Sequence, residues 1–324
     1  MANLSILGSG AWGSALSIAL SDNFEKIYLH AYTEEEAKSL SPKHPALSVN
    51  YPDNVELTSD LSPIQHSQSV LIAVPSYGFG STLETIQPLL TSKHNVAWVT
   101  KGFDTDKGRF LHESFEAILN DHFSCAISGP SFAFEVATRK PTALTVASLD
   151  KNTRDYWSKA LHTKTLRTYT NEDIIGVEVG GSLKNILAIA AGIAAGLGFG
   201  ANTQAALITR GLAEMIRLGK SLGAHERTFN GLSGLGDLVL TCSDDLSRNR
   251  RFGKELANNQ SVEQALDNVG ATVEGLNTLE LVLSIAKKNK VELPICEQVY
   301  QVTQGNVTPT QAVTQLMLRD QIKE

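Results

Sequence analysis

A lysine stands where the second half of the chain turns from glycine-rich to apolar. Lys184 lies within residues 176–185 (GVEVGGSLKN), after a double glycine and at the start of an apolar helical stretch. Burial against apolar neighbours would lower its pKa and suit it to proton transfer, although position alone favours a solvated lysine. Asn185 beside it could donate a hydrogen bond to a substrate or cap a helix.

A carboxylate occupies a similar setting farther along the chain. Asp237 lies in residues 231–242 (GLSGLGDLVLTC), after three glycines and before an apolar run. A carboxylate in such a turn could orient a lysine or cap the following helix, and position alone favours capping.

Three arginines follow within four positions, in the segment Ser247-Arg248-Asn249-Arg250-Arg251. Guanidinium groups match phosphate oxygens in pairs, so the cluster predicts a phosphate clamp. A solvated basic helix start is an equally good interpretation of the same residues.

The N-terminal segment carries a dinucleotide-binding pattern. Gly8-Ser9-Gly10-Ala11-Trp12-Gly13 follows an apolar strand and precedes a helix, which is the context that GxGxxG requires. The first glycine would permit the tight turn, the second the approach of backbone to a pyrophosphate, and the third close helix–strand packing. The N–H groups at the helix start would bind the phosphates.

The acidic residue that often follows the second strand of this pattern is missing. The strand ends His30-Ala31-Tyr32-Thr33, and residues 34–36 (EEE) come later, where they indicate a helix start. A carboxylate at the strand end would select the ribose 2′-hydroxyl and repel a 2′-phosphate. No arginine replaces it, so the sequence leaves the choice between NAD and NADP open.

These residues need two kinds of scaffold. Apolar runs at 4–7, 27–30, 70–74, 96–100, 126–128, 143–147 and 165–170 alternate with helical stretches and predict a largely parallel sheet. From about residue 173 strand signals vanish, and helices are expected through residue 223 and at 251–258, 261–268, 274–289 and 310–322. We therefore predict a doubly wound α/β (Rossmann-type) domain over residues 1–180 and an all-α domain over residues 181–324.

Two further segments follow strands of the predicted sheet. Thr100-Lys101-Gly102 and Gly129-Pro130-Ser131 stand at carboxyl ends of strands, where open α/β sheets bind their ligands.

Composition excludes several classes of protein. The 324 residues are 42% hydrophobic and 19% charged, which is typical of a globular chain of about two domains. A net charge of −6 gives no reason to bind nucleic acid or an anionic membrane. Three scattered cysteines and eight histidines without HExxH spacing predict reduced thiols and no metal site. Residues 185–201 are apolar but short for a membrane span and broken by glycines, so we expect a packed helix and a cytoplasmic protein.

The ordered segments together resemble the NAD(P)-dependent glycerol-3-phosphate dehydrogenase family, bacterial type. The resemblance covers nearly the whole chain. It is carried by GSGAWG at 8–13, TKGF at 100–103, SGPSFAFEVA at 128–137, GVEVGGSLKNILAIAAG at 176–192, GFGANTQAALITRGLAEM at 198–215, GLSGLGDLVLTC at 231–242, SRNRRFG at 247–253 and TVEG at 272–275.

The resemblance implies interconversion of sn-glycerol 3-phosphate and dihydroxyacetone phosphate with NAD or NADP, for phospholipid synthesis. It implies catalytic roles for Lys184, Asp237 and Lys101. The substrate-binding positions that it implies are Lys101, Gly129, Ser131, Lys184, Asn185, Asp237, Thr241, Ser247, Arg248 and Asn249. The cofactor-binding positions are Gly8, Gly10, Ala11, Trp12, Gly13, Lys101, Ala133, Arg248, Thr272 and Glu274.

The chain departs from this family near the adenosine end of the cofactor. Tyr32 stands where many bacterial members have arginine, and Pro45-Ala46-Leu47-Ser48 replaces a Tyr-Leu-Pro-Gly stretch. Two alternatives stay open: another two-domain β-hydroxyacid dehydrogenase, of the 6-phosphogluconate or 3-hydroxyisobutyrate kind, and a dinucleotide sensor without turnover. The expected partner is a small phosphorylated three-carbon substrate, without nucleic acid or membrane span, and a homodimer is expected.

Overall fold

A computed structural model describes residues 2–258 and 260–318. The chain divides into two compact units, one ending at Glu178 and the other beginning at Val179.

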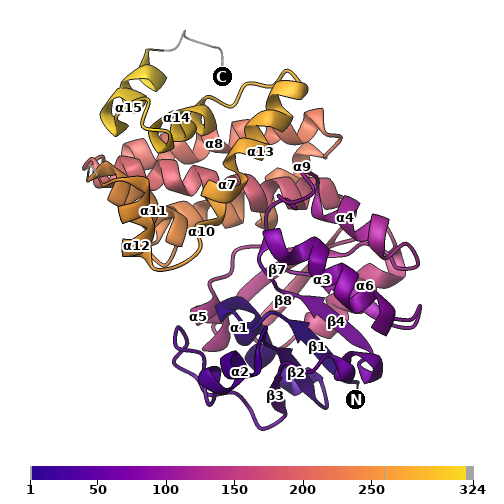
Figure 1. The fold of residues 1–324 in the computed structure, drawn as a ribbon. Helices are drawn as coiled ribbons and strands as arrows, with labels where there is room; N and C mark the ends of the chain where they lie inside the picture. The colour runs from indigo at the N-terminus through magenta and orange to yellow at the C-terminus, as the bar shows by residue number, and fades with distance from the viewer. Residues whose placement is uncertain (1, 259, 319–324) are drawn as a thin grey trace. The chain divides into compact units, whose positions relative to one another are not determined.

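The first unit is built on one eight-stranded sheet (Figure 1). Its strands are β1 (Leu4–Leu7), β2 (Ile27–His30), β3 (Val55–Thr58), β4 (Ser69–Ile72), β5 (Asn95–Trp98), β6 (Ala126–Ser128), β7 (Thr142–Ala147) and β8 (Leu166–Asn171). They lie in the order β3-β2-β1-β4-β5-β6-β7-β8. All neighbours pair in parallel except β6 and β7, which are antiparallel. The order reverses beside β1, so the predicted doubly wound sheet is confirmed.

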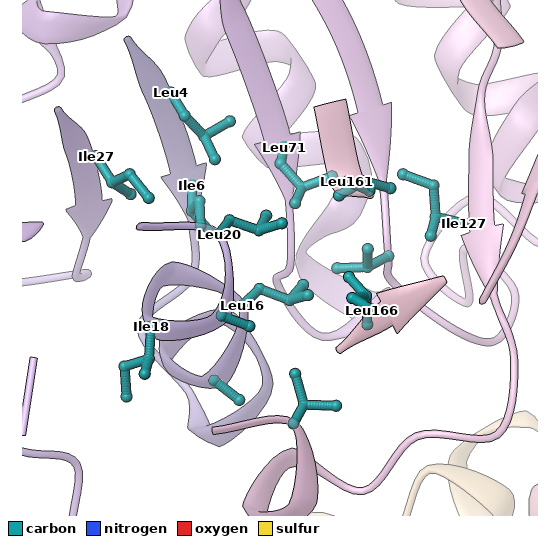
Figure 2. Close-up of a cluster of buried hydrophobic side chains, with 14 of the residues drawn as sticks. Leu4, Ile6, Leu16, Ile18, Leu20, Ile27, Leu71, Ile127, Leu161 and Leu166 are labelled. Carbon is teal, nitrogen blue, oxygen red and sulfur yellow. The ribbon is translucent and has the colours of Figure 1, made fainter. Parts of the chain in front are cut away.

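The helices of this unit connect the strands and cover both faces of the sheet. They are α1 (Ala11–Ala19), α2 (Glu34–Leu40), α3 (Phe79–Ile86), α4 (Leu111–Ile118), α5 (Ala133–Ala137) and α6 (Lys151–Leu161). On one face Leu16 of α1, Leu20 directly after it and Leu161 of α6 pack against Ile6 and Leu71 of the sheet (Figure 2). On the other face, the rings of Phe79 in α3 and Phe115 in α4 both pack against Trp98.

One strand of the sheet was not predicted from the sequence. β3 has only four residues, VELT, and pairs with β2 from Ile27–Val55 to His30–Thr58. Such a short edge strand with a central glutamate lacks the continuous apolar run on which the prediction relied. β4 and β5 also end two residues earlier than predicted, so Thr100 and Lys101 lie beyond the end of β5.

The second unit contains helices and no strand among its described residues, as predicted (Figure 1). Its helices are α7 (Ile174–Gly196, which begins in the first unit), α8 (Ala201–Ser221), α9 (Glu226–Phe229), α10 (Asp237–Ser243), α11 (Arg248–Ala257), α12 (Val262–Val269), α13 (Glu274–Lys288), α14 (Pro294–Thr303) and α15 (Pro309–Met317). Helix α14 was not predicted. Of the helix expected at residues 310–322, residues 319–322 lie outside the described part of the chain.

Helix α7 is the one helix of the described residues long and apolar enough to cross a membrane by length and composition. Within its most apolar window, 89% of the residues are buried in the protein. The expected packed helix is therefore present, and glycines make the packing possible: a Cβ on Gly192 would lie 2.0 Å from the carbonyl oxygen of Arg250 in α11.

Candidate active site

Lys184 projects from α7 into a buried polar site of the second unit. Its Nζ donates hydrogen bonds to Oδ1 of Asp237 at 2.5 Å and to Oγ1 of Thr241 at 3.1 Å. Lys184 is 6% exposed and Asp237 is fully buried. We call these three residues the lysine site. The interpretation of Lys184 as a solvated surface lysine is wrong, because its ammonium is held in an ion pair.

Glycines bring the two helices of the lysine site together. A Cβ on Gly180, one turn before Lys184, would lie 2.4 Å from the carbonyl oxygen of Ser233. Ser233 belongs to a π-helical turn, Leu232–Gly236, that leads directly into α10 and its first residue, Asp237. The close approach at Gly180 thus places Asp237 within reach of Lys184, and π-turns of this kind are frequent at functional sites.

Hydrogen bonds of two asparagine side chains, one of them next to Lys184 in the sequence, link α7, α11 and α13. The N–H of Gly275 donates to Oδ1 of Asn249 at 2.9 Å, and Nδ2 of Asn249 donates to Oδ1 of Asn185 at 3.0 Å. Nδ2 of Asn185 in turn donates to Oε2 of Glu274 at 3.1 Å. We call these four residues the amide chain. It fixes the orientation of both asparagines, since each carbonyl accepts and each amide donates.

The arginine cluster divides into residues with different environments. Ser247 caps α11 by accepting a hydrogen bond from the N–H of Arg250, and Arg248 is exposed at the first position of the helix. Arg250 is ion-paired with Asp245, which also binds Lys254 at 2.6 Å. The guanidinium of Arg248 and the N-terminus of α11 together favour binding of an anion at Arg248. The guanidinium of Arg250 is paired with Asp245, and the three-arginine clamp stays a prediction.

The cysteine in this region is not a reactive thiol. Burial raises the pKa of Cys242 to about 12, with Lys184 and Arg250 opposing that shift and Asp237 adding to it. The thiol stays protonated at neutral pH, so it offers no nucleophile beside the lysine site.

In the first unit, residues 8–13, here called the glycine loop, have the geometry of a phosphate-binding turn. Gly8 has φ +110°, and a Cβ there would lie 2.8 Å from the carbonyl oxygen of Ala73. A Cβ on Gly13 would lie 2.0 Å from the carbonyl oxygen of Gly8, whereas one on Gly10 would meet nothing within 4 Å. Helix α1 begins there without a side-chain cap or an acidic residue in its first turn. An uncapped helix start beside a glycine with open space around it suits a dinucleotide pyrophosphate, so these residues fit the cofactor.

The predicted residues after β5 and β6 also lie together. Nζ of Lys101 donates to the carbonyl oxygen of Gly129 at 3.1 Å, and Oγ of Ser131 donates to the same oxygen at 3.3 Å. Gly129 has φ +144°, and a Cβ there would lie 3.0 Å from the carbonyl oxygen of Ala143. Ala133 opens α5 and packs into the same core cluster as Trp12.

Hydrogen bonds thus join most of the predicted polar residues into three clusters: Lys101 with Gly129 and Ser131 in the first unit, and the lysine site and the amide chain in the second. Thr272 is exposed and lies in the segment before α13. Its side chain makes no hydrogen bond to these clusters among the described residues. Sequence analysis missed one residue, Glu36, whose carboxylate accepts a hydrogen bond from Ser9 Oγ at 2.6 Å. The acidic run at residues 34–36 was the available signal, and it was interpreted only as a helix start.

Comparison with known proteins identifies the family. Residues 3–154 match the family model of the NAD-dependent glycerol-3-phosphate dehydrogenase N-terminus, and residues 173–314 match that of the C-terminus. The chain is 68% identical to glycerol-3-phosphate dehydrogenase [NAD(P)+] of Ruthia magnifica subsp. Calyptogena magnifica, over 99% of each chain. It is 65% identical to the enzyme of the same name from Vesicomyosocius okutanii subsp. Calyptogena okutanii, over 98% of each chain.

A solved structure agrees with these matches. The crystal structure of glycerol-3-phosphate dehydrogenase from Coxiella burnetii superimposes with a TM-score of 0.94 at 39% identity, covering 98% of this chain and 99% of that one. The chain belongs to the NAD-dependent glycerol-3-phosphate dehydrogenase family.

Proposed function

We propose that this chain interconverts sn-glycerol 3-phosphate and dihydroxyacetone phosphate with NAD(P)(H), acting on the CH–OH group of the donor. Family membership over both units makes it an NAD(P)-dependent oxidoreductase. The observation that carries the mechanism is the buried Lys184–Asp237 pair, 2.5 Å apart. A bound NAD(P)H supplies the hydride for the substrate carbonyl carbon.

In this proposal, Lys184 is the proton donor of the reduction. Its ammonium stabilises negative charge on the substrate oxygen and gives that oxygen a proton from Nζ, and it takes the proton back in the oxidation. Asp237 and Thr241 hold Nζ in one place through their hydrogen bonds. Lys101 is proposed as a further catalytic group that contacts both substrate and cofactor.

The phosphate of the substrate is assigned to the start of α11. Arg248 supplies a charged fork, and the helix N-terminus capped by Ser247 adds positive potential. Asn249 and Asn185, oriented by the amide chain, are proposed to bind substrate oxygens, with Gly129 and Ser131 as further substrate contacts.

Residues 1–180 are proposed to bind the dinucleotide and residues 181–324 to carry the main catalytic and substrate residues. The glycine loop is assigned to the pyrophosphate, with Trp12, Lys101 and Ala133 as further contacts in the first unit. From the second unit we assign Arg248, Thr272 and Glu274 to the cofactor. In the cell we propose a cytoplasmic homodimer that supplies glycerol 3-phosphate for phospholipid synthesis.

The experiment that tests this proposal is a spectrophotometric assay of NADH and NADPH oxidation with dihydroxyacetone phosphate. We expect rapid oxidation by the wild-type protein and almost none by Lys184→Ala, with dinucleotide binding retained in both. Turnover of 6-phosphogluconate or 3-hydroxyisobutyrate instead would favour the hydroxyacid dehydrogenase alternative. Tight dinucleotide binding without turnover of any of these substrates would favour a sensor.

A further inference from the structure

The carboxylate of Glu36, a residue of α2, forms a hydrogen bond with the glycine loop. Its Oε1 accepts a hydrogen bond from Ser9 Oγ at 2.6 Å, and its Oε2 accepts one from the N–H of Tyr32 at 3.0 Å. Ser9 lies between the first two glycines of the loop, and Tyr32 is the second residue after β2. The carboxylate therefore bridges the glycine loop and the end of β2.

This bridging position is the one where doubly wound folds bind the adenosine ribose. There an acidic residue at the end of the second strand accepts a hydrogen bond from the 2′-hydroxyl. In this chain the strand itself supplies none. Helix α2 supplies the carboxylate instead, because Thr33 caps the helix and the N–H of Glu36 bonds to Thr33 Oγ1 at 3.2 Å, which turns the Glu36 side chain back over the helix start.

The surroundings of Glu36 favour a hydroxyl over a phosphate. Each of its oxygens accepts one of these two bonds, and a carboxylate can accept about four. Lys38, the basic residue nearest in sequence, is ion-paired with Glu34 at 2.6 Å. Burial lowers the pKa of His44 below its usual value, with Glu36 opposing that shift, so this ring carries little positive charge at neutral pH that could attract a phosphate. Tyr32, 94% exposed, brings no positive charge.

We propose that Glu36 is the residue that makes this enzyme prefer NAD(H) to NADP(H). Its carboxylate accepts a hydrogen bond from the 2′-hydroxyl of the adenosine ribose and repels a 2′-phosphate at the same place. Ser9 is a positioning residue that holds the carboxylate over the glycine loop. This inference rests on the proposed dinucleotide site and assigns the residue that determines its specificity for NAD(H).

The test is equilibrium titration of NADH and NADPH, followed by the fluorescence of the reduced nicotinamide. We expect the wild-type protein to bind NADH at least about tenfold more tightly, and Glu36→Gln to reduce that ratio about tenfold or more, the effect of one hydrogen bond to a charged group. Glu35→Gln removes the same charge from the exposed neighbouring position and should leave the ratio unchanged. Ser9→Ala should reduce the ratio by less than Glu36→Gln.

Ionic strength separates charge repulsion from a helix-capping role. The wild-type preference should shrink in about 1 M salt, where the Debye length is about 3 Å, whereas the ratio of Glu36→Gln should change little. Equal or tighter binding of NADPH by the wild type, or equal weakening of both dinucleotides in Glu36→Gln, would overturn the inference. NADH-selective binding without turnover would instead reject the proposed reaction and leave the role of Glu36 intact, and binding of neither dinucleotide would reject both.

Discussion

Gly10 of the glycine loop and two glycines of the second unit, Gly180 and Gly192, are needed for opposite reasons. In the loop, Gly10 leaves open space beside the backbone, where a ligand can approach. In the second unit, Gly180 and Gly192 leave no space at all, because carbonyl oxygens of other segments lie where their side chains would be. Gly10 thus leaves room for a ligand, whereas Gly180 and Gly192 allow segments of the second unit to pack closely.

The largest effect on activity should come from Lys184, which the close packing at Gly180 brings next to Asp237. Replacing Lys184 with Ala should lower kcat by about 10²–10⁴-fold, the usual contribution of a general acid. NADH affinity should stay unchanged, because the proposed pyrophosphate site lies in the other unit. Steady-state kinetics and NADH titration check both expectations. Lys220→Ala, which removes an exposed lysine paired with Glu226, is the control and should keep wild-type kcat. A Lys184→Ala protein with near wild-type kcat contradicts the assignment.

The two uses of glycine can be separated by the same substitution at two sites. Gly192→Ala would place a Cβ 2.0 Å from a carbonyl oxygen of α11 and should cost about 3 kcal/mol in unfolding free energy. Gly10→Ala should cost about 0.5 kcal/mol or less, since its φ is −60° and its Cβ is free, but it should weaken NADH binding about tenfold. Thermal unfolding and NADH titration of both variants measure the contrast. Equal losses of unfolding free energy in Gly192→Ala and Gly10→Ala would contradict the contrast between these two glycines.

The same contrast explains what the sequence could predict. The glycine loop, its strand and its helix are local, so spacing within about 20 residues was enough to predict them. The pairing of Lys184 with Asp237 joins residues 53 apart, and the amide chain joins Asn185 to Asn249 and Glu274, so these contacts depend on how helices pack. The sequence allowed Asp237 to orient a lysine, but it did not predict the bonds of the amide chain. Glu36 was missed because its role depends on the direction of a side chain at a helix start.

The two units should also respond to pH in opposite directions. In the first unit, burial lowers the pKa of His30 from 6.5 to about 4, with Asp60 opposing the shift. Between pH 6.5 and 4 the unfolded chain then binds a proton that the folded chain does not, so stability falls as pH falls, by up to about 3 kcal/mol. His30→Leu should remove this loss.

In the second unit, burial raises the pKa of Glu214 from 4.5 to about 7, although its carboxylate accepts hydrogen bonds from the N–H groups of Ile295 and Cys296. Between pH 4.5 and 7 the folded chain holds a proton on Glu214 that the unfolded chain does not, so the contribution of Glu214 to the free energy of unfolding falls as pH rises through this range. Glu214→Gln should flatten that part of the profile. Unfolding midpoints across pH 4–8 for wild type and both variants test the signs, and a His30→Leu protein as acid-sensitive as wild type would contradict the first.

Two arginines at the start of α11, Arg248 and Arg250, should differ in their effect on substrate affinity. Arg248→Gln should raise the KM for dihydroxyacetone phosphate about 10–100-fold, the loss of a hydrogen bond to a charged phosphate. Arg250→Gln should change that KM by less than about threefold, because Asp245 already binds its guanidinium. The ion pair has an exposed partner and contributes about 1 kcal/mol or less to the stability of the fold. Steady-state kinetics at low salt compare the two. If both substitutions raise KM equally, the arginines act as one clamp, and Asp245 must release Arg250 when the phosphate binds. Asp245→Asn would then lower the KM, whereas it should leave the KM unchanged if Arg248 acts alone.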